Sequence, residues 1–175
     1  RILSTLMDTL ARQESDKKQI ASEVLQGYET MGILQELAET LSTLNNACQA
    51  ASHALDSLVR LTRANGGCIA AKTGDKTLRL LACIGDSDQA SKLLVHNSPF
   101  VTQTLKTGSG ELLTDTREDS RVAHDGFLSL MCAPLIWGGS NNGLILIGST
   151  QAEAFAANDF KLLTHISLLT AAAVA

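Results

Sequence analysis

The first third of the chain alternates apolar and polar residues in a pattern close to a heptad. Apolar side chains recur at spacings of three and four, at Leu3, Leu6, Leu10, Ile20, Val24, Met31, Leu34, Ala38 and Leu41. Gln13 and Lys17 interrupt this stripe with polar side chains. The spacing predicts a helix over residues 3–45, which would rise roughly 60 Å at ~1.5 Å per residue, longer than a small domain is wide. We therefore expect residues 1–27 to form a coiled-coil or linker helix.

This helix predicts a parallel homodimer, because an isolated amphipathic helix would leave its apolar stripe in water. The expected dimer interface consists of Leu3, Leu6, Leu10, Ile20, Val24, Met31 and Leu34. The alternative is a helix that packs on its own domain as a monomer.

The remaining residues alternate between helical and strand-like periods. Asn45 and Asn46 separate the first helix from a second, which is expected to end at Asn65-Gly66-Gly67 with glycine in the left-handed conformation. A β-hairpin follows, with strands at 68–71 and 78–84 around the turn 73–76.

The second half begins with a polar middle, residues 85–127, and ends in a second hairpin and a helix. The expected elements are a helix from Ser98-Pro99 to about Thr107, a strand at 111–114, a loop at 115–125, strands at 128–136 and 144–149 joined by 137–143, and a helix from Asn158. This order predicts an α+β fold, an antiparallel sheet with helices packed on one face.

Composition narrows the possible partners. Apolar residues make up 45% of the 175 residues, which supports a buried core, and the net charge of −4 argues against nucleic acid as a partner. No apolar run reaches the ~18 residues that a membrane span needs. We expect a cytoplasmic module without membrane contact of its own, within a parent protein that is free to be anchored elsewhere.

The chain lacks the usual signatures of metal binding and catalysis. The four cysteines form no CxxC motif, and the four histidines include no i, i+4 pair. Buried reduced thiols acting as small apolar residues explain the cysteines. We expect no metal, haem, bilin or other cofactor, and no enzymatic activity, because no nucleophile–base pair can be named.

The most polar stretch is Asp115-Thr116-Arg117-Glu118-Asp119-Ser120-Arg121. Ion pairs between neighbours in water explain this cluster adequately. The alternative is that Arg117 or Arg121 turns toward an anionic ligand.

From about Tyr28 to the end, the chain resembles a GAF domain of a bacterial signalling protein. The resemblance rests on Lys106-Thr107-Gly108, Leu112 to Asp115, Ser129 to Leu135, Gly143 to Ile147 and Asn158-Asp159-Phe160, in that order. It implies a sensor domain over residues 28–175, with a sheet backed by N- and C-terminal helices and a small-molecule pocket roofed by the irregular middle. The candidate pocket residues are Thr114, Asp115, Arg117, His124, Phe127, Ser129 and Met131.

The resemblance also implies a place in a larger protein, with helices relaying the state of the sensor to a kinase, cyclase, phosphatase or transcription regulator in the same chain. The features of three subfamilies are missing: the bilin-linking cysteine, the cyclic-nucleotide signature, and the pocket-loop cysteines of free methionine sulfoxide reductases. The ligand is thus unidentified. The alternative function is a ligandless module for dimerisation and spacing.

Overall fold

The computed structural model describes residues 2–74, 77–85, 98–122 and 126–175, with the side chains of 2–6 and 8 outside the description. The chain divides into two compact units, Arg1–Leu37 and Ala38–Ala175. No helix in the described ranges combines the length and apolar character needed to cross a bilayer.

The helix α1 (Ile2–Thr43) confirms the helix expected over residues 3–45, and its residues from Ala38 onward belong to the second unit. Its large apolar side chains are mostly in water, with exposed fractions of 52% to 71%. These side chains are Met7, Leu10, Ile20, Val24, Leu25, Tyr28 and Met31. Leu34 is partly buried, and the side chains of Leu3 and Leu6 lie outside the description.

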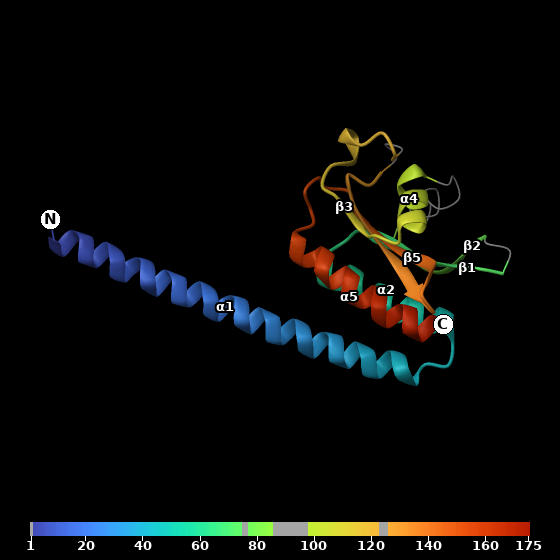
Figure 1. Ribbon diagram of the computed structural model, residues 1–175, viewed down its shortest axis with the longest axis horizontal. Helices are drawn as coiled ribbons and strands as arrows, with labels where there is room; N and C mark the ends of the chain where they lie inside the picture. Colours follow the sequence, from blue (N-terminus) through green and yellow to red (C-terminus); the bar gives the residue numbers. More distant parts are fainter. Residues whose placement is uncertain (1, 75–76, 86–97, 123–125) are drawn as a thin grey trace. The chain divides into compact units, whose positions relative to one another are not determined.

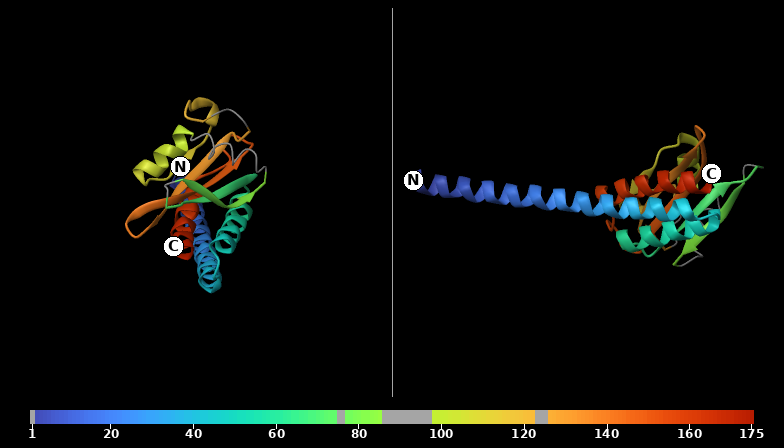
Figure 2. Two further views of the ribbon diagram at one scale, coloured as in Figure 1. Left: turned by 90° about the vertical axis from the view of Figure 1, so that its right-hand side faces the viewer. Right: turned by 90° about the horizontal axis from the view of Figure 1, so that it is seen from below.

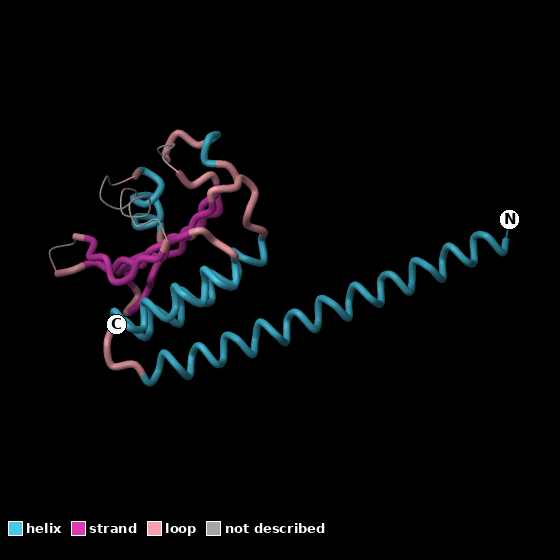
Figure 3. The backbone as a smooth tube through the Cα atoms, turned by 180° about the vertical axis from the view of Figure 1, so that it is seen from behind, coloured by secondary structure: helices cyan, strands magenta, loops and turns pink. Residues whose placement is uncertain are grey.

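The second unit is built on a five-stranded antiparallel sheet in the order β2-β1-β5-β4-β3. The strands are β1 (Gly66–Lys72), β2 (Leu78–Ile84), β3 (Glu111–Leu113), β4 (Ser129–Trp137) and β5 (Ser140–Ser149). The helices α2 (Ala47–Thr62) and α5 (Ala157–Val174) cover one face, and α4 (Pro99–Thr107) lies on the other (Figures 1 and 3). The α+β prediction is confirmed, and α2 and α5 lie side by side (Figure 2).

Alternation along the strands divides the core between these two faces. Leu130 and Cys132 on β4 pack with α4, in a cluster that contains Phe100. Met131 and Ala133 alternate with them, so they point to the face that α2 and α5 cover. β4 is therefore covered on both faces, since all four of these side chains are at most 1% exposed.

Two turn regions differ from the sequence prediction. The α2 helix ends earlier than expected, and the left-handed residue at its C-terminus is Arg63 rather than a glycine. Gly66 and Gly67 instead open β1, where a Cβ would stand 2.7 Å from the Ile84 carbonyl oxygen and 2.6 Å from the Leu146 carbonyl oxygen. These glycines are required by close strand packing, not by a helix cap.

The second hairpin has a much shorter connection than the seven residues expected. Gly138 and Gly139 alone join β4 to β5, with φ values of 59° and 74°. Positive φ at both central residues matches the hairpin turn whose twist fits right-handed strands. The polar residues that follow, Ser140 to Asn142, belong to β5.

Arg121 fastens the irregular middle to the sheet and to α4. Its Nη2 donates to Asp119 Oδ2 and to Glu111 Oε1, each at 2.6 Å, and its Nη1 donates to Gln103 Oε1 at 2.6 Å. The guanidinium carbon also lies 5.5 Å from the centre of the Phe100 ring. We call Arg121, Glu111, Asp119, Gln103 and Phe100 the Arg121 clamp.

The start of α4 is tied to the same point. Ser98 precedes the helix, with proline at its first position, but the hydroxyl makes no cap hydrogen bond. It donates instead to the Arg121 carbonyl oxygen at 2.8 Å. Ser98 therefore joins the start of α4 to the loop.

We predict that Arg121→Ala lowers the free energy of unfolding of the domain by about 1–2 kcal/mol. Several charged hydrogen bonds are lost, and partial solvent access reduces the effect of each. Arg117→Ala is the matched control, because Arg117 bonds only Asp115 in the described residues and its side chain is 61% exposed. Urea unfolding of both variants checks the prediction, and equal losses would show that the clamp has no special role.

The clamp also predicts a pH dependence. Hydrogen bonds from the Arg121 side chain hold the pKa of Asp119 below its ordinary value. A carboxyl group with a lowered folded-state pKa stabilises the fold above its unfolded pKa of about 3.9, and this stabilisation is lost as the pH falls through the folded value. Asp119→Asn should therefore destabilise the domain at pH 7, with a difference from wild type that shrinks below about pH 4. Urea unfolding across this range checks it, and a constant difference would contradict it.

Candidate functional site

The face of the sheet under α4 is the candidate site, because here a short helix and loops replace the long helices of the other face. We call it the α4 face. Its buried side chains are Cys68, Ala70, Phe100, Val101, Val122, Phe127, Leu130, Cys132, Leu144 and Leu146. This lining is apolar.

Phe127 fills one end of the α4 face. Its ring lies on Gly148 of β5, where a Cβ would stand 2.5 Å from the Phe127 Cγ. A Cβ on Gly66 would stand 3.4 Å from the ring's Cζ. The two glycines are partners across β1 and β5, so the absence of their side chains makes the seat for the ring.

The α4 helix is held down by polar contacts near its C-terminus. The Asn141 side-chain amide donates to the carbonyl oxygens of Thr104 and Leu105, at 3.0 and 3.1 Å.

Burial raises the pKa of the Cys132 thiol to about 12, and a side-chain hydrogen bond with Thr104 opposes this shift. Cys132 is therefore protonated at neutral pH.

Three candidate pocket residues, Thr114, Asp115 and Arg117, follow the end of β3. Asp115 accepts from the Arg117 backbone N–H at 3.0 Å and from its Nη2 at 2.6 Å, opening a 3₁₀ turn, η1 (Thr116–Glu118). These hydrogen bonds lower the pKa of Asp115 to about 2. Thr116 is buried, and its hydroxyl donates to the Phe127 carbonyl oxygen at 2.8 Å. The structure thus brings the end of β3 beside Phe127.

The other candidates lie elsewhere. Ser129 and Met131 are fully buried on the face opposite the α4 face, and the Ser129 hydroxyl donates to the Gln151 carbonyl oxygen at 2.8 Å. Sequence alone left the direction of these two side chains open. His124 lies outside the described residues.

Both arginines of the charged loop are engaged by carboxylates. Arg117 bonds Asp115, and Arg121 bonds Asp119 and Glu111. The pairs Arg117–Asp115 and Arg121–Asp119 join residues two positions apart in the sequence, so the ion-pair interpretation of this stretch is confirmed. Glu111 and Gln103 were missed as partners of Arg121, since they lie ten and 18 positions away and belong to other elements.

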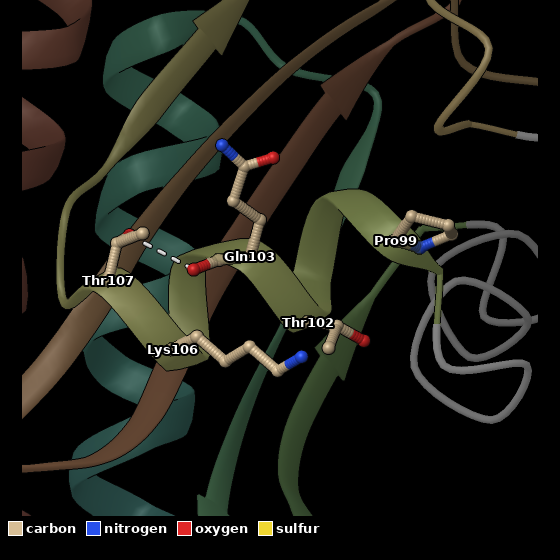
Figure 4. Close-up of a pocket in the computed structure, with 5 residues that line it drawn as sticks. All are labelled: Pro99, Thr102, Gln103, Lys106 and Thr107. Carbon is tan, nitrogen blue, oxygen red and sulfur yellow. Dashed lines mark hydrogen bonds between the residues drawn. The ribbon is translucent and has the colours of Figure 1, made fainter.

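Two open grooves lie outside the α4 face. One, of about 460 Å³, follows the outer surface of α4 and is lined by Pro99, Thr102, Gln103, Lys106 and Thr107 (Figure 4). Its floor is the helix itself, with the Thr107 hydroxyl donating to the Gln103 carbonyl oxygen at 3.0 Å. The second, also about 460 Å³, is lined by Leu44, Cys48, Gln49, Ser52, His53 and Asp56. Within the described parts of the chain, no group of three or more His, Cys, Asp or Glu side chains has a metal-binding arrangement.

Comparisons with known proteins agree on one fold. Residues 46–175 match the model of a family described as GAF domain. The GAF domain of a phosphoenolpyruvate-protein phosphotransferase from Coxiella burnetii superposes with a TM-score of 0.72 at 18% identity, covering 83% of this chain and 92% of that one.

Two further solved structures have the same fold. A free methionine-R-sulfoxide reductase from Neisseria meningitidis, solved with its substrate, gives a TM-score of 0.69 at 12% identity, over 83% of this chain and 87% of that one. Residues 122 to 287 of a methyl-accepting chemotaxis protein superpose with a TM-score of 0.62 at 12% identity, covering 79% of this chain and 94% of that one. No curated protein matches the sequence.

The family model covers well over half of the chain, and the neighbours include both signalling proteins and an enzyme. The chain therefore belongs to the GAF domain family, whose members are commonly regulatory or signalling modules.

Proposed function

We propose that this chain is a non-catalytic sensor module of a cytoplasmic bacterial signalling protein. It binds a small molecule and relays its bound state through paired helices to an output domain in the same parent chain. The output is a kinase, a cyclase, a phosphatase or a transcription regulator. The observation that carries the proposal is the row of exposed apolar side chains on α1, which a binding domain alone does not need.

The proposed ligand site is the end of the α4 face where β3 stops. Thr114, Asp115, Arg117 and Phe127 form its front, and the Thr116–Phe127 hydrogen bond supports this grouping. His124, the remaining candidate from this loop, lies outside the described residues. Ser129 and Met131 lie at this end of the sheet on the opposite face, where they are fully buried. A polar rim beside an apolar face suits a small organic molecule with a few hydrogen-bonding groups.

A second candidate function is a ligandless module for dimerisation and spacing. It is favoured by Phe127, whose ring already occupies the seat over Gly66 and Gly148. The sensor domain proposed for residues 28–175 serves both functions, with residues 1–27 as the coiled-coil or linker helix.

The two functions share a parallel homodimer formed through α1. Leu10 and Ile20 are each 60% exposed, Val24 52% and Met31 69%. Burying one such side chain is worth about 1.5–3 kcal/mol, so several along one stripe favour pairing strongly. Gln13, Lys17 and Gly27 interrupt the stripe, which allows two arrangements of the pair to lie close in energy, and a bound ligand need only shift that equilibrium.

We predict that the chain is a dimer at tens of micromolar. The triple variant Leu10→Asp, Ile20→Asp and Val24→Asp should be a monomer, because charges placed along the seam repel and lose the apolar contact. Sedimentation equilibrium measures both.

The matched control is the triple variant Ser15→Asp, Ser22→Asp and Gln26→Asp, which adds the same charge to the opposite side of the helix. It should remain a dimer, and far-UV circular dichroism should show a folded domain in all three proteins. A monomeric wild type, or a dimer that survives the seam substitutions, would reject pairing through α1.

The ligand is tested with a panel of amino acids, organic acids, purines and nucleotides in a thermal-unfolding screen. A compound present at 100 times its dissociation constant should add about 2.7 kcal/mol to the free energy of unfolding. Arg117→Ala should weaken this stabilisation, whereas Lys106→Ala, on the outer groove of α4, should leave it unchanged. If nothing on the panel stabilises the domain and native mass spectrometry finds no co-purified molecule, the spacer function is favoured.

A further inference from the structure

We infer that Cys68 and Cys83 form a thiol pair that a hydroperoxide converts reversibly into a cross-strand disulfide. The inference does not depend on the proposed ligand, because it rests on the first hairpin alone.

The register of the sheet sets the two cysteines face to face. Cys68 on β1 and Cys83 on β2 are direct partners in the antiparallel ladder. Direct partners in such a ladder have Cα atoms about 4.5–5.5 Å apart, and disulfides span Cα distances of about 4.4–6.8 Å. The backbone therefore already has the separation that a disulfide requires.

Both side chains lie on the same face. Cys68 belongs to the core cluster of the α4 face, and Cys83 packs against that cluster from the edge strand. Burial, followed by the proximity of Cys83 and Cys132, raises the pKa of Cys68 well above its ordinary value. That effect of the neighbouring thiols agrees with the placement from the register.

The remaining cysteines are placed differently. Cys132 lies in the same row, but Leu146 of β5 stands between it and Cys68. Two strand spacings, about 9.5 Å, separate their backbones, which is too far for a disulfide. Cys48 lies on α2, on the other side of the sheet. All four cysteines are reduced in the structure.

Exposure determines where the reaction begins. Cys68 has no exposed surface, whereas Cys83 is partly exposed on β2, the edge strand. The Cys83 thiol gives its proton to water and its sulfur attacks one oxygen of the hydroperoxide. The O–O bond breaks, and the leaving hydroxide or alkoxide takes up that proton to become water or an alcohol. The product is a sulfenic acid on Cys83.

The second step closes the bridge. The Cys68 sulfur attacks the Cys83 sulfur, the S–O bond breaks, and the departing hydroxide takes the Cys68 proton to leave as water. Two thiols are thereby oxidised by two electrons and one hydroperoxide is reduced. A dithiol reverses the reaction by thiol–disulfide exchange.

The disulfide would join the edge strand β2 covalently to its neighbour β1. It closes the loop between residues 68 and 83, and a covalent loop restricts the unfolded chain, so the oxidised domain should resist unfolding more than the reduced one. Cys68 and Cys83 both belong to the α4 face, so the disulfide would make one side of the candidate site more rigid.

The test is hydrogen peroxide treatment of the folded, fully reduced 175-residue chain, followed by alkylation and digestion without reductant. Trypsin cuts after Lys72, Lys76 and Arg79, so the two cysteines fall on separate peptides unless a disulfide joins them. We expect mass spectrometry to find the joined peptide pair, together with a higher melting temperature. Dithiothreitol should reverse both changes.

Two variants serve as controls. Cys83→Ser should give neither the joined peptides nor the shift in melting temperature, and its side chain is accessible enough for serine to be tolerated. Cys48→Ser should behave as wild type. Oxidation of Met7, which is 69% exposed and lies outside the proposed dimer interface, confirms in every sample that the oxidant has acted.

Several outcomes would overturn the inference. These are thiols at positions 68 and 83 that stay reduced while Met7 is oxidised, a bridge from Cys68 to Cys132, a bridge between two chains through Cys48, and sulfinic acid on Cys83 beside an intact Cys68 thiol. A bridge that forms only in urea would also reject it, because the folded register would then play no part. A stoichiometric thiophilic metal that protects both thiols from alkylation would replace the redox site with a metal site.

Discussion

The architecture of the second unit depends on β5 being buried on both faces. From Gly143 to Ser149 every residue of this strand is buried. An antiparallel sheet with such a centre has no solvated face, so it needs a cover on each side. One cover is the pair α2 and α5, whose apolar faces are long and regular. The other is α4 with the described residues of the irregular middle, which contribute Phe100, Val101, Val122 and Phe127 to the buried cluster.

The Arg121 clamp adds polar contacts to this second cover. Its acceptors come from α4, from β3 and from the loop after η1, so one side chain joins three segments. Polar contacts at a partly exposed site contribute less stability than a packed core. The α4 cover should therefore open at lower free energy than the α2 and α5 cover, as expected of elements that move on binding.

Sequence periodicity was sufficient for the long elements. The stripes of α1, α2 and α5 repeat over several turns, and the strand alternation of β4 and β5 identified the second hairpin. The same patterns failed where a single residue decides the geometry. Arg63 takes the left-handed conformation expected of a glycine, and Gly138 and Gly139 shorten a connection that appeared to need seven residues.

The pairing of Cys68 with Cys83 is the clearest example of a feature that the sequence pattern does not predict. The Thr73–Thr77 hydrogen bond fixes the turn of the first hairpin, and continuing its register without interruption would set Cys68 opposite Ala82. An irregularity between Ile69 and Ala70 shifts the ladder by one residue and sets Cys68 opposite Cys83 instead. Because a one-residue shift exchanges the faces of a strand, no reading of local propensity finds this pair. The Arg121 clamp was missed for a similar reason, since Gln103 and Glu111 are distant from Arg121 in the sequence and meet it only in three dimensions.

One row of side chains connects these features. It crosses all five strands on the α4 face, through Cys83, Cys68, Leu146, Cys132 and Glu111. Its first two members are the thiol pair, and its last, Glu111, receives two hydrogen bonds from Arg121. Close-packed interiors transmit small displacements instead of absorbing them. Oxidation at the β2 edge and movement of the α4 cover at the β3 edge would thus act on the same layer of the sheet, so a change at one end alters the contacts on which the other depends.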